Sequence, residues 1–398
     1  MTNKRAALFL IPFLVLVFLT GCVTTPYEEI STPLVSVKPS KVSFLADDLD
    51  EENLELAAVR SLKYYERLPE TALFTFGQDI YTVRELKGSL LELLEILATS
   101  DSDQERNSRI KGAFTIYKSI GRGEEGSVFF TGYYEPLLHG SLEKTARYRH
   151  PLYRIPDDHV IIDLGQFKER YRGKSIIARI KDGRVVPYYT REDIDGEKSL
   201  KGRGLEIAWV DDPIDLFFLH IQGSGTIRLP DCTSMQVSYA HKNGHPYRSI
   251  GRLLVDRGKI TMDESSMDSI KAYLRQYPQE MTDILNHNES YVFFRIVDKG
   301  PIGSLNVPVT QQRSIATDSS LFPKGALAFI KTKKPVIGKD GVIKEWVSFS
   351  RFVLNQDTGG AIKGPGRVDL FCGKGKEAEI MAGHMKEEGE LYFLVKKR

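Results

Sequence analysis

The chain has 398 residues, of which 41% are hydrophobic and 27% are charged, so it is long enough for two or three globular domains. Its 55 basic and 53 acidic residues nearly cancel and leave a net charge of +2. A chain so close to neutrality has no strong positive field, and no basic run is interleaved with aromatic residues. We therefore expect no nucleic-acid partner.

The N-terminus has the parts of a secretory signal. Lys4 and Arg5 precede an apolar run over residues 6–19, which small residues follow. The run is too short for a comfortable membrane span. The sequence Leu-Thr-Gly-Cys that ends at Cys22 resembles a bacterial lipobox, which implies cleavage before this cysteine and its lipidation. The alternative is an ordinary signal peptide that contains a cysteine.

Two cysteines, Cys232 and Cys372, remain beyond the signal. An exported location permits a disulfide, but two cysteines alone do not establish that they pair, so this question stays open. Two cysteines cannot build the usual structural zinc site, and no Glu-x-x-His spacing is present. His241 and His245 are spaced His-x-x-x-His, but they flank a predicted turn and do not support a metal site. We expect neither a metal nor another cofactor.

The first third of the chain is predicted to be a tether followed by helices. Residues 23–42 are rich in Thr, Ser and Pro, a composition typical of a tether. Residues 48–121 look helical: Thr82 and Glu85 form a capping-box pattern before leucines at helical spacing. The segment SRIKGAFTIYKSIG suits another helix that ends at Gly121.

From position 128 the pattern changes to short β-rich segments. Asp182-Gly183 supplies the tight turn of a predicted hairpin, and residues 246–287 return to helix. After Tyr291, five short apolar runs are separated by Gly and Pro, a spacing typical of a small β-barrel or sandwich. We predict an α+β protein, mainly β, whose main barrel is interrupted by a second β-rich part.

The stretch QDTGGAIKGPGRVD places Asp357 and Asp369 twelve positions apart around a glycine-rich loop. Asp-Thr-Gly also occurs on the catalytic loop of aspartic proteases, which need two such loops to bring two carboxylates together. The nearest second candidate, around Asp318, lacks the glycine, so a protease is disfavoured. A glycine-rich turn with acidic edges and no catalytic role is the plain alternative.

The surroundings of these acids favour a site. Asp318, Asp357 and Asp369 each lie at a predicted strand edge beside Gly or Ser, and such loops converge at the mouth of a barrel. Val368 and Leu370 flank Asp369 with apolar side chains. A carboxyl group among apolar neighbours has a raised pKa and acts as a general acid.

Longer motifs give a family resemblance. FTGYYEP, HIQGSG, SYAHKNGHPYRSIGRLLVDRG, SYVFF, VPVTQQRSIATD and DTGGAIKGPGRVD occur in this order between positions 130 and 369. On these residues the chain resembles the membrane-bound lytic murein transglycosylase A family, and its last motif also resembles the three-aspartate domain. The resemblance covers about residues 128–395, two-thirds of the chain.

The resemblance implies a large domain built on a double-psi β-barrel, an inserted smaller β-domain, a groove between them, and N-terminal helices. The implied segments are a signal peptide with lipobox (1–22), a tether (23–42), a helical N-terminal part of the large domain (43–136), the insert (137–239), and the rest of the large domain (240–398). The three-aspartate segment spans about 305–372.

The implied reaction is cleavage of the β-1,4 bond between N-acetylmuramic acid and N-acetylglucosamine in peptidoglycan, by a lytic exotransglycosylase. The residues themselves do not distinguish attack at chain ends from attack within chains. No water is consumed, because the muramic 6-hydroxyl closes a 1,6-anhydro ring. This hydroxyl is already tethered, so one carboxyl can act first as acid and then as base.

By resemblance, Asp369 is the catalytic residue and Asp357 supports it. Substrate binding is expected from Tyr133, Tyr134, Gln222, Gly223, Ser224 and Lys363. Core packing is the alternative for at least one of the two tyrosines, and plain solvation for Lys363.

The expected partners are peptidoglycan glycan strands, the membrane through a lipid at Cys22, and proteins of cell-wall synthesis or division. Val23, rather than the Asp that commonly retains lipoproteins in the inner membrane, follows the cysteine. We therefore expect an outer-membrane lipoprotein that faces the periplasm. A non-catalytic glycan-binding lipoprotein on the same fold is one alternative, and a hydrolase is another.

Overall fold

The computed structural model describes residues 32–398 apart from 124–125 and 263–264. The predicted signal peptide, Cys22 and the tether as far as Ser31 lie outside the described residues. None of the helices that the structure describes has both the length and the apolar character needed to cross a bilayer.

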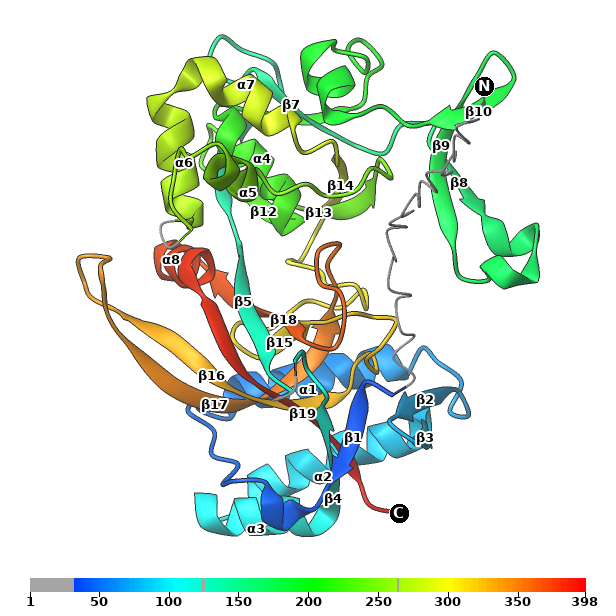
Figure 1. The fold of residues 1–398 in the computed structure, drawn as a ribbon, viewed down its shortest axis with the longest axis vertical. Helices are drawn as coiled ribbons and strands as arrows, with labels where there is room; N and C mark the ends of the chain where they lie inside the picture. The colour runs from blue at the N-terminus through cyan, green and yellow to red at the C-terminus, as the bar shows by residue number, and fades with distance from the viewer. Residues whose placement is uncertain (1–31, 124–125, 263–264) are drawn as a thin grey trace, which may run out of the picture. The chain divides into compact units, whose positions relative to one another are not determined.

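In the described part of the chain, six strands close into a barrel in the order β5-β18-β15-β17-β16-β19, and β19 pairs back with β5 (Figure 1). These strands are β5 (Val128–Glu135), β15 (Ser314–Ala316), β16 (Leu327–Ile337), β17 (Ile343–Asp357), β18 (Arg367–Lys374) and β19 (Lys386–Lys396). β5 runs parallel to β18, and β15 runs parallel to β17. The barrel predicted from the apolar runs is confirmed, and β5 enters it from far earlier in the chain.

Alternate residues of the barrel strands fill its interior. Phe130 in β5 and Val368 and Leu370 in β18 are fully buried in the main hydrophobic core. Since successive side chains of a strand point to opposite faces, Thr131 and Asp369 lie on the other face of this strand pair. The apolar neighbours of Asp369 therefore hold its strand in place while the carboxyl points away from the core.

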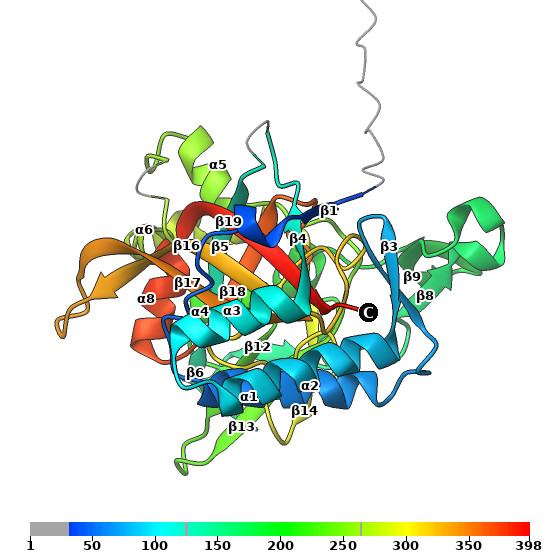
Figure 2. The same ribbon diagram turned by 90° about the horizontal axis from the view of Figure 1, so that it is seen from below.

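The N-terminal helices are α1 (Glu52–Tyr65), α2 (Val83–Thr99) and α3 (Asp103–Ala113), with a hairpin of β2 (Leu73–Phe76) and β3 (Asp79–Thr82) between the first two. The predicted capping box is confirmed: the Thr82 hydroxyl accepts from the Glu85 amide, and the Glu85 carboxylate accepts from the Thr82 amide at 2.7 Å. α1 packs against β17 and α2 against β19 (Figure 2). These helices therefore cover one side of the barrel.

Two predictions for this region are wrong. The helix expected to end at Gly121 stops at Ala113, and β4 (Phe114–Ser119) follows, paired with β19. Its alternating Phe114 and Ile116 are fully buried. The tether expected up to residue 42 does not persist either, because Leu34–Val37 forms β1 on the other edge of β4, and Leu34 is buried in the core.

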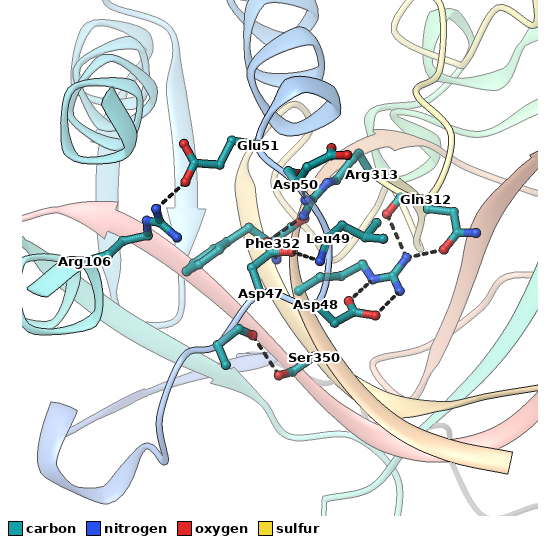
Figure 3. Close-up of polar contacts among 12 residues, drawn as sticks. Asp47, Asp48, Leu49, Asp50, Glu51, Arg106, Gln312, Arg313, Ser350 and Phe352 are labelled. Carbon is teal, nitrogen blue, oxygen red and sulfur yellow. Dashed lines mark hydrogen bonds and ion pairs between the residues drawn. The ribbon is translucent and has the colours of Figure 1, made fainter. Parts of the chain in front are cut away.

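Residues 46–50, which we call the strap, are fastened to the barrel by two fully buried arginines (Figure 3). Arg351 donates from Nε and Nη2 to the two carboxylate oxygens of Asp48, both at 2.8 Å. Arg313 donates to the Asp47 carboxylate and to the Asp50 carbonyl oxygen, both at 2.6 Å. A buried guanidinium without an acceptor is costly, so these arginines require the strap.

A second sheet has the strand order β14-β13-β12-β6-β11-β7. Its strands are β6 (Leu137–Ser141), β7 (His150–Tyr153), β11 (Glu206–Val210), β12 (Ser224–Arg228), β13 (Ser234–Lys242) and β14 (Val292–Val297). The helices α4 (Pro213–Gln222), α5 (Ile250–Asp256), α6 (Met267–Gln276) and α7 (Pro278–Asn286) belong to the same stretch, and α8 (Lys376–His384) lies between β18 and β19. The sheet recruits β14 from beyond the range predicted for the insert.

A smaller three-stranded sheet consists of β8 (Val160–Asp163), β9 (Ser175–Lys181) and β10 (Arg184–Pro187). The hairpin predicted at Asp182-Gly183 is confirmed, since both residues have positive φ angles, 51° and 72°. The question of a disulfide is also answered for this structure. Cys232 is exposed, Cys372 is buried, and both are free thiols.

Candidate active site

Strand β15 brings the two aspartates to either side of one residue. Ala316 is the register partner of Asp357 in β17 and of Asp369 in β18. Neighbouring strands lie about 4.8 Å apart, so the two backbone positions are about 10 Å from each other. Their side chains therefore belong to one site, in which burial and, to a smaller extent, the charge of Asp369 raise the pKa of Asp357.

Asp369 is held through a single carboxylate oxygen. The Thr131 hydroxyl donates a short hydrogen bond to Oδ1, and Thr131 is also the register partner of Asp369 across β5 and β18. Arg367 lies with Nη2 3.2 Å from the same oxygen and donates to the Thr131 hydroxyl at 2.8 Å. The three side chains thus form a closed polar triangle on one face of the strand pair.

The second oxygen of Asp369 is left for chemistry. Within the described ranges, no protein group forms a hydrogen bond with Oδ2, and the side chain keeps 19% of its surface exposed. Burial raises the pKa of Asp369, whereas the Arg367 guanidinium and the Thr131 hydroxyl act in the opposite direction. A carboxyl of this kind can hold a proton on Oδ2 and present it to a bound ligand.

Asp357 differs because both of its oxygens are occupied. The amides of Ser304 and Thr358 donate to Oδ1, and the Tyr133 hydroxyl donates to Oδ2, each at 2.9 Å. Burial raises the pKa of Asp357 to about 6, although these hydrogen bonds favour its ionised form. All of these groups are donors, so the ionised carboxylate is the form that this cradle fits.

A glycine makes the cradle possible. A Cβ at Gly303 would lie 2.7 Å from the carbonyl oxygen of Gln356, the residue before Asp357. Such a contact is too close for any other residue without a backbone shift. Gly303 therefore allows the Ser304 amide to reach the carboxylate.

Of the residues predicted for substrate binding, the structure brings Tyr133 to the aspartates. Its ring lies 5.1 Å from that of Phe371, which comes two positions after Asp369 and therefore lies on the same face of β18. Burial, together with Asp357, raises the pKa of Tyr133 well above its usual value, so the phenol remains a donor. Tyr133 shares the face of β5 that carries Thr131.

Four other predicted residues gather at the junction between β5 and α4. Tyr134 is buried, and its backbone amide donates to the Gln222 side-chain oxygen at 3.0 Å. Gly223 ends α4 with φ 77°, and Ser224 is buried at the start of β12. Among the described residues, no hydrogen bond joins these four to either aspartate. Their binding role stays a prediction.

Lys363 lies beside the third acid. Its Nζ is 4.0 Å from Asp318, and its side chain is exposed. Asp318 accepts from the Ser320 and Gly364 amides at 3.1 and 2.9 Å. Although burial works against ionisation, these hydrogen bonds lower the pKa of Asp318. Asp318 thus ties the glycine-rich loop to the turn after β15.

The sequence interpretation missed Thr131, Arg367 and Ser304. The first two each stand two positions before a predicted residue, Tyr133 or Asp369, so the period of a β-strand places them on the same face. That alternation was a usable signal. Ser304 contributes only its backbone amide, for which the sequence carries no signature.

The chain matches two family models and several known proteins. Residues 129–295 match the MltA specific insert domain, and residues 313–395 match the 3D domain. Membrane-bound lytic murein transglycosylase A of Escherichia coli (strain K12) is 30% identical over 292 residues, which cover 73% of this chain and 71% of the relative.

Solved structures share the fold. The membrane-bound lytic murein transglycosylase from Agrobacterium tumefaciens is 31% identical, with a TM-score of 0.74 over 91% of this chain and 97% of that one. E. coli MltA with bound chitohexaose, at 24% identity, has a TM-score of 0.71 over 92% and 96% of the two chains, which supports the fold alone. The chain therefore belongs to the membrane-bound lytic murein transglycosylase A family.

Proposed function

We propose that this protein is a lytic transglycosylase that cleaves the β-1,4 bond between N-acetylmuramic acid and N-acetylglucosamine in peptidoglycan and leaves 1,6-anhydromuramic ends. The proposal rests on the surroundings of Asp369. One of its carboxylate oxygens is anchored by hydrogen bonds, the other is available to a ligand, and burial raises the pKa of the group. Relatives named as lytic murein transglycosylases support it.

In this mechanism Asp369 enters protonated on Oδ2. It donates that proton to the glycosidic oxygen while the bond from C1 of the muramic residue breaks, and an oxocarbenium-like centre develops. The ionised carboxylate then takes the proton of the 6-hydroxyl as O6 bonds to C1. Asp369 is then protonated again, and no water is consumed.

Arg367 and Thr131 stabilise the ionised half of this cycle. Both act on Oδ1, so they favour the carboxylate that forms after proton donation without occupying the reacting oxygen. Asp357 supplies a second negative charge beside the developing oxocarbenium, and its cradle keeps it ionised near neutral pH. Asp357 is thus a supporting residue and not a second acid.

The glycan is proposed to lie along the face that carries Tyr133. The ring of Tyr133 offers a flat apolar surface to a pyranose, while its hydroxyl is engaged by Asp357. Lys363 is exposed on the glycine-rich loop and suits a sugar hydroxyl or the lactyl carboxylate. Relatives named as lytic murein transglycosylases support a glycan ligand.

The finer architecture belongs to the same proposal. Two parallel strand pairs within a six-stranded barrel support the double-psi type. We keep the insert at 137–239 and the large domain on either side of it, with β14 contributing to the sheet of the insert. Export, lipidation at Cys22 and an outer-membrane location facing the periplasm rest on the sequence pattern.

Mass spectrometry of peptidoglycan digested with the chain from Val23 onward, wild type beside Asp369→Asn, tests the function. We expect anhydromuropeptides from the wild type alone. Reducing-end products would indicate a hydrolase. Glycan that is bound but left uncut by the wild type would indicate a binding protein.

A further inference from the structure

The sheet of β8, β9 and β10, with its connection 164–174, forms an arm that has one apolar face. The strand register pairs Ile162 with Ile176, Val160 with Ala178, and Val185 with Ile180. Paired residues of antiparallel strands share a face, and successive residues alternate. These six side chains therefore lie together on one side of the arm.

The opposite face of the arm contacts the rest of the protein through Ile177 and Arg179, while Ile161, the register partner of Ile177, is 53% exposed. Ile177 packs against the core that contains Tyr153 and Tyr188, and a Cβ at Gly244 would lie 2.7 Å from the Cβ of Ile177. The Arg179 guanidinium lies 4.0 Å from the ring centroid of Tyr189. Both Ile177 and Arg179 alternate with the apolar set, so the apolar face is turned away from these contacts.

That apolar face is open to solvent towards its two ends, whereas Ala178 in its middle is buried, at 2% exposure. Ile176, Ile180 and Val185 are 46%, 64% and 56% exposed, and Phe167 in the connection between β8 and β9 is 73% exposed. Figure 1 shows β8 and β9 at the right of the view, apart from the other sheets. A cluster of exposed large apolar side chains marks a docking surface.

The arm also concentrates positive charge. Residues 160–187 contain seven basic residues and three acidic ones, in a chain whose net charge is only +2. Four exposed bases, Lys168, Arg170, Arg172 and Lys174, lie in the same connection as Phe167. Lys181 and Arg184 are exposed on either side of the hairpin turn. The charge therefore borders the apolar face at both ends.

We propose that the arm docks on the surface of a lipid bilayer that contains anionic headgroups. Aliphatic side chains and Phe167 would enter the boundary between headgroups and acyl chains, and the flanking Lys and Arg side chains would contact lipid phosphates. A glycan strand fits this face poorly, because sugar rings are bound by aromatic platforms and hydrogen-bonding groups, and the face has only aliphatic side chains.

The proposal does not depend on the catalytic assignment. It gives the insert an orientation relative to a membrane, and it limits the glycan that the site reaches to strands near that membrane. The predicted lipid at Cys22 would hold the chain beside such a surface, and the arm would supply a second, weaker contact.

Sedimentation with vesicles tests the proposal on the chain from Val23 onward, which keeps every described residue. The vesicles are phosphatidylethanolamine with phosphatidylglycerol, and phosphatidylcholine alone as the neutral comparison. The variants are Ile180→Glu, Phe167→Glu and the double variant Lys168→Gln/Arg170→Gln. Leu91→Glu, at a side chain 55% exposed on α2, is the matched control.

We expect binding to the anionic vesicles at low salt, a loss of about tenfold or more in each arm variant, and wild-type binding by Leu91→Glu. Unchanged release of muropeptides from soluble peptidoglycan fragments would show that each variant is folded. Absence of wild-type binding, or equal binding by the arm variants, would overturn the proposal. The proposal would also be overturned if the arm variants lost binding to insoluble peptidoglycan but kept binding to vesicles. It would likewise be overturned if the wild type formed a dimer that Ile180→Glu dissociates.

Discussion

Tyr133 in β5 donates its phenolic hydrogen to Oδ2 of Asp357 at 2.9 Å, across 224 positions of sequence. This hydrogen bond joins the strand that opens the barrel to the glycine-rich loop near its end. It also stabilises the ionised carboxylate, so it works against the burial that raises the pKa of Asp357. The protonation of the supporting aspartate therefore depends on a tyrosine from the first half of the chain.

Removing this hydroxyl by Tyr133→Phe should raise the pKa of Asp357 above about 6. The acidic limb of the pH dependence of kcat/KM should move to higher pH, and activity at neutral pH should fall about tenfold. Tyr392→Phe is the control, since that hydroxyl donates to Glu390, which is not among the predicted site residues. A Tyr133→Phe profile that superimposes on the wild type would contradict this role.

Thr131→Val should slow catalysis with little change in KM, because the lost hydroxyl anchors Oδ1 of Asp369 and not the sugar. A charge-assisted hydrogen bond of this kind is worth about 1.5–3 kcal/mol, which corresponds to roughly 10–100-fold in kcat. The measurement is the initial rate of anhydromuropeptide release. Thr131→Ser should restore most of the rate, and failure to do so would assign the loss to packing.

Asp357→Asn should change how stability depends on pH. The folded-state pKa of Asp357, about 6, lies above the usual aspartate value of 3.8, so the folded protein binds this proton more tightly than the unfolded chain. The contribution that this proton makes to the free energy of unfolding is fully present below pH 3.8 and is lost as the pH rises through 6.

The variant lacks this titration, so its free energy of unfolding relative to wild type should rise between pH 4.5 and 7.5. The upper limit of the change is about 3 kcal/mol. Urea unfolding at several pH values measures it. A difference between the two proteins that stays constant with pH would refute the raised pKa.

The strap should be essential for stability. Asp48→Ala leaves the fully buried guanidinium of Arg351 without its paired acceptor, which should cost about 3 kcal/mol in unfolding free energy. Asp340→Ala is the comparison, because both side chains of the Asp340–Lys344 ion pair are more than half exposed. It should cost less than about 1 kcal/mol. Equal losses of unfolding free energy in the two variants would show that the buried ion pair stabilises the protein no more than an exposed one.

Local features of the fold were predictable from the sequence. Thr82 and Glu85 lie within one helical turn, and Asp182-Gly183 carries its own turn geometry, so neighbouring residues suffice to define both. The helix predicted for Phe114–Ser119 is wrong because this segment follows α3 directly, with Gly112 inside the helix and not after it, and its strand partner β19 comes more than 270 positions later.

The site was predictable only in part for the same reason. The resemblance and the apolar neighbours pointed to Asp369, and β-strand alternation held the clue to Thr131 and Arg367. The role of the Ser304 amide could not be predicted, because every residue except proline has a backbone N–H and the sequence does not indicate which one binds a carboxylate. Gln222 stays a predicted glycan contact, and the hydrogen bond that its side-chain oxygen accepts from the Tyr134 amide could not be predicted, because it depends on tertiary structure.

The central claim is that Asp369 alone acts as acid and base while the sugar's own hydroxyl attacks. Digestion of peptidoglycan in ¹⁸O-labelled water, followed by mass spectrometry of the muropeptides, tests it most directly. We predict 1,6-anhydro ends without ¹⁸O from the wild type and no such ends from Asp369→Asn. Reducing ends that carry ¹⁸O, or wild-type product levels from Asp369→Asn, would contradict it.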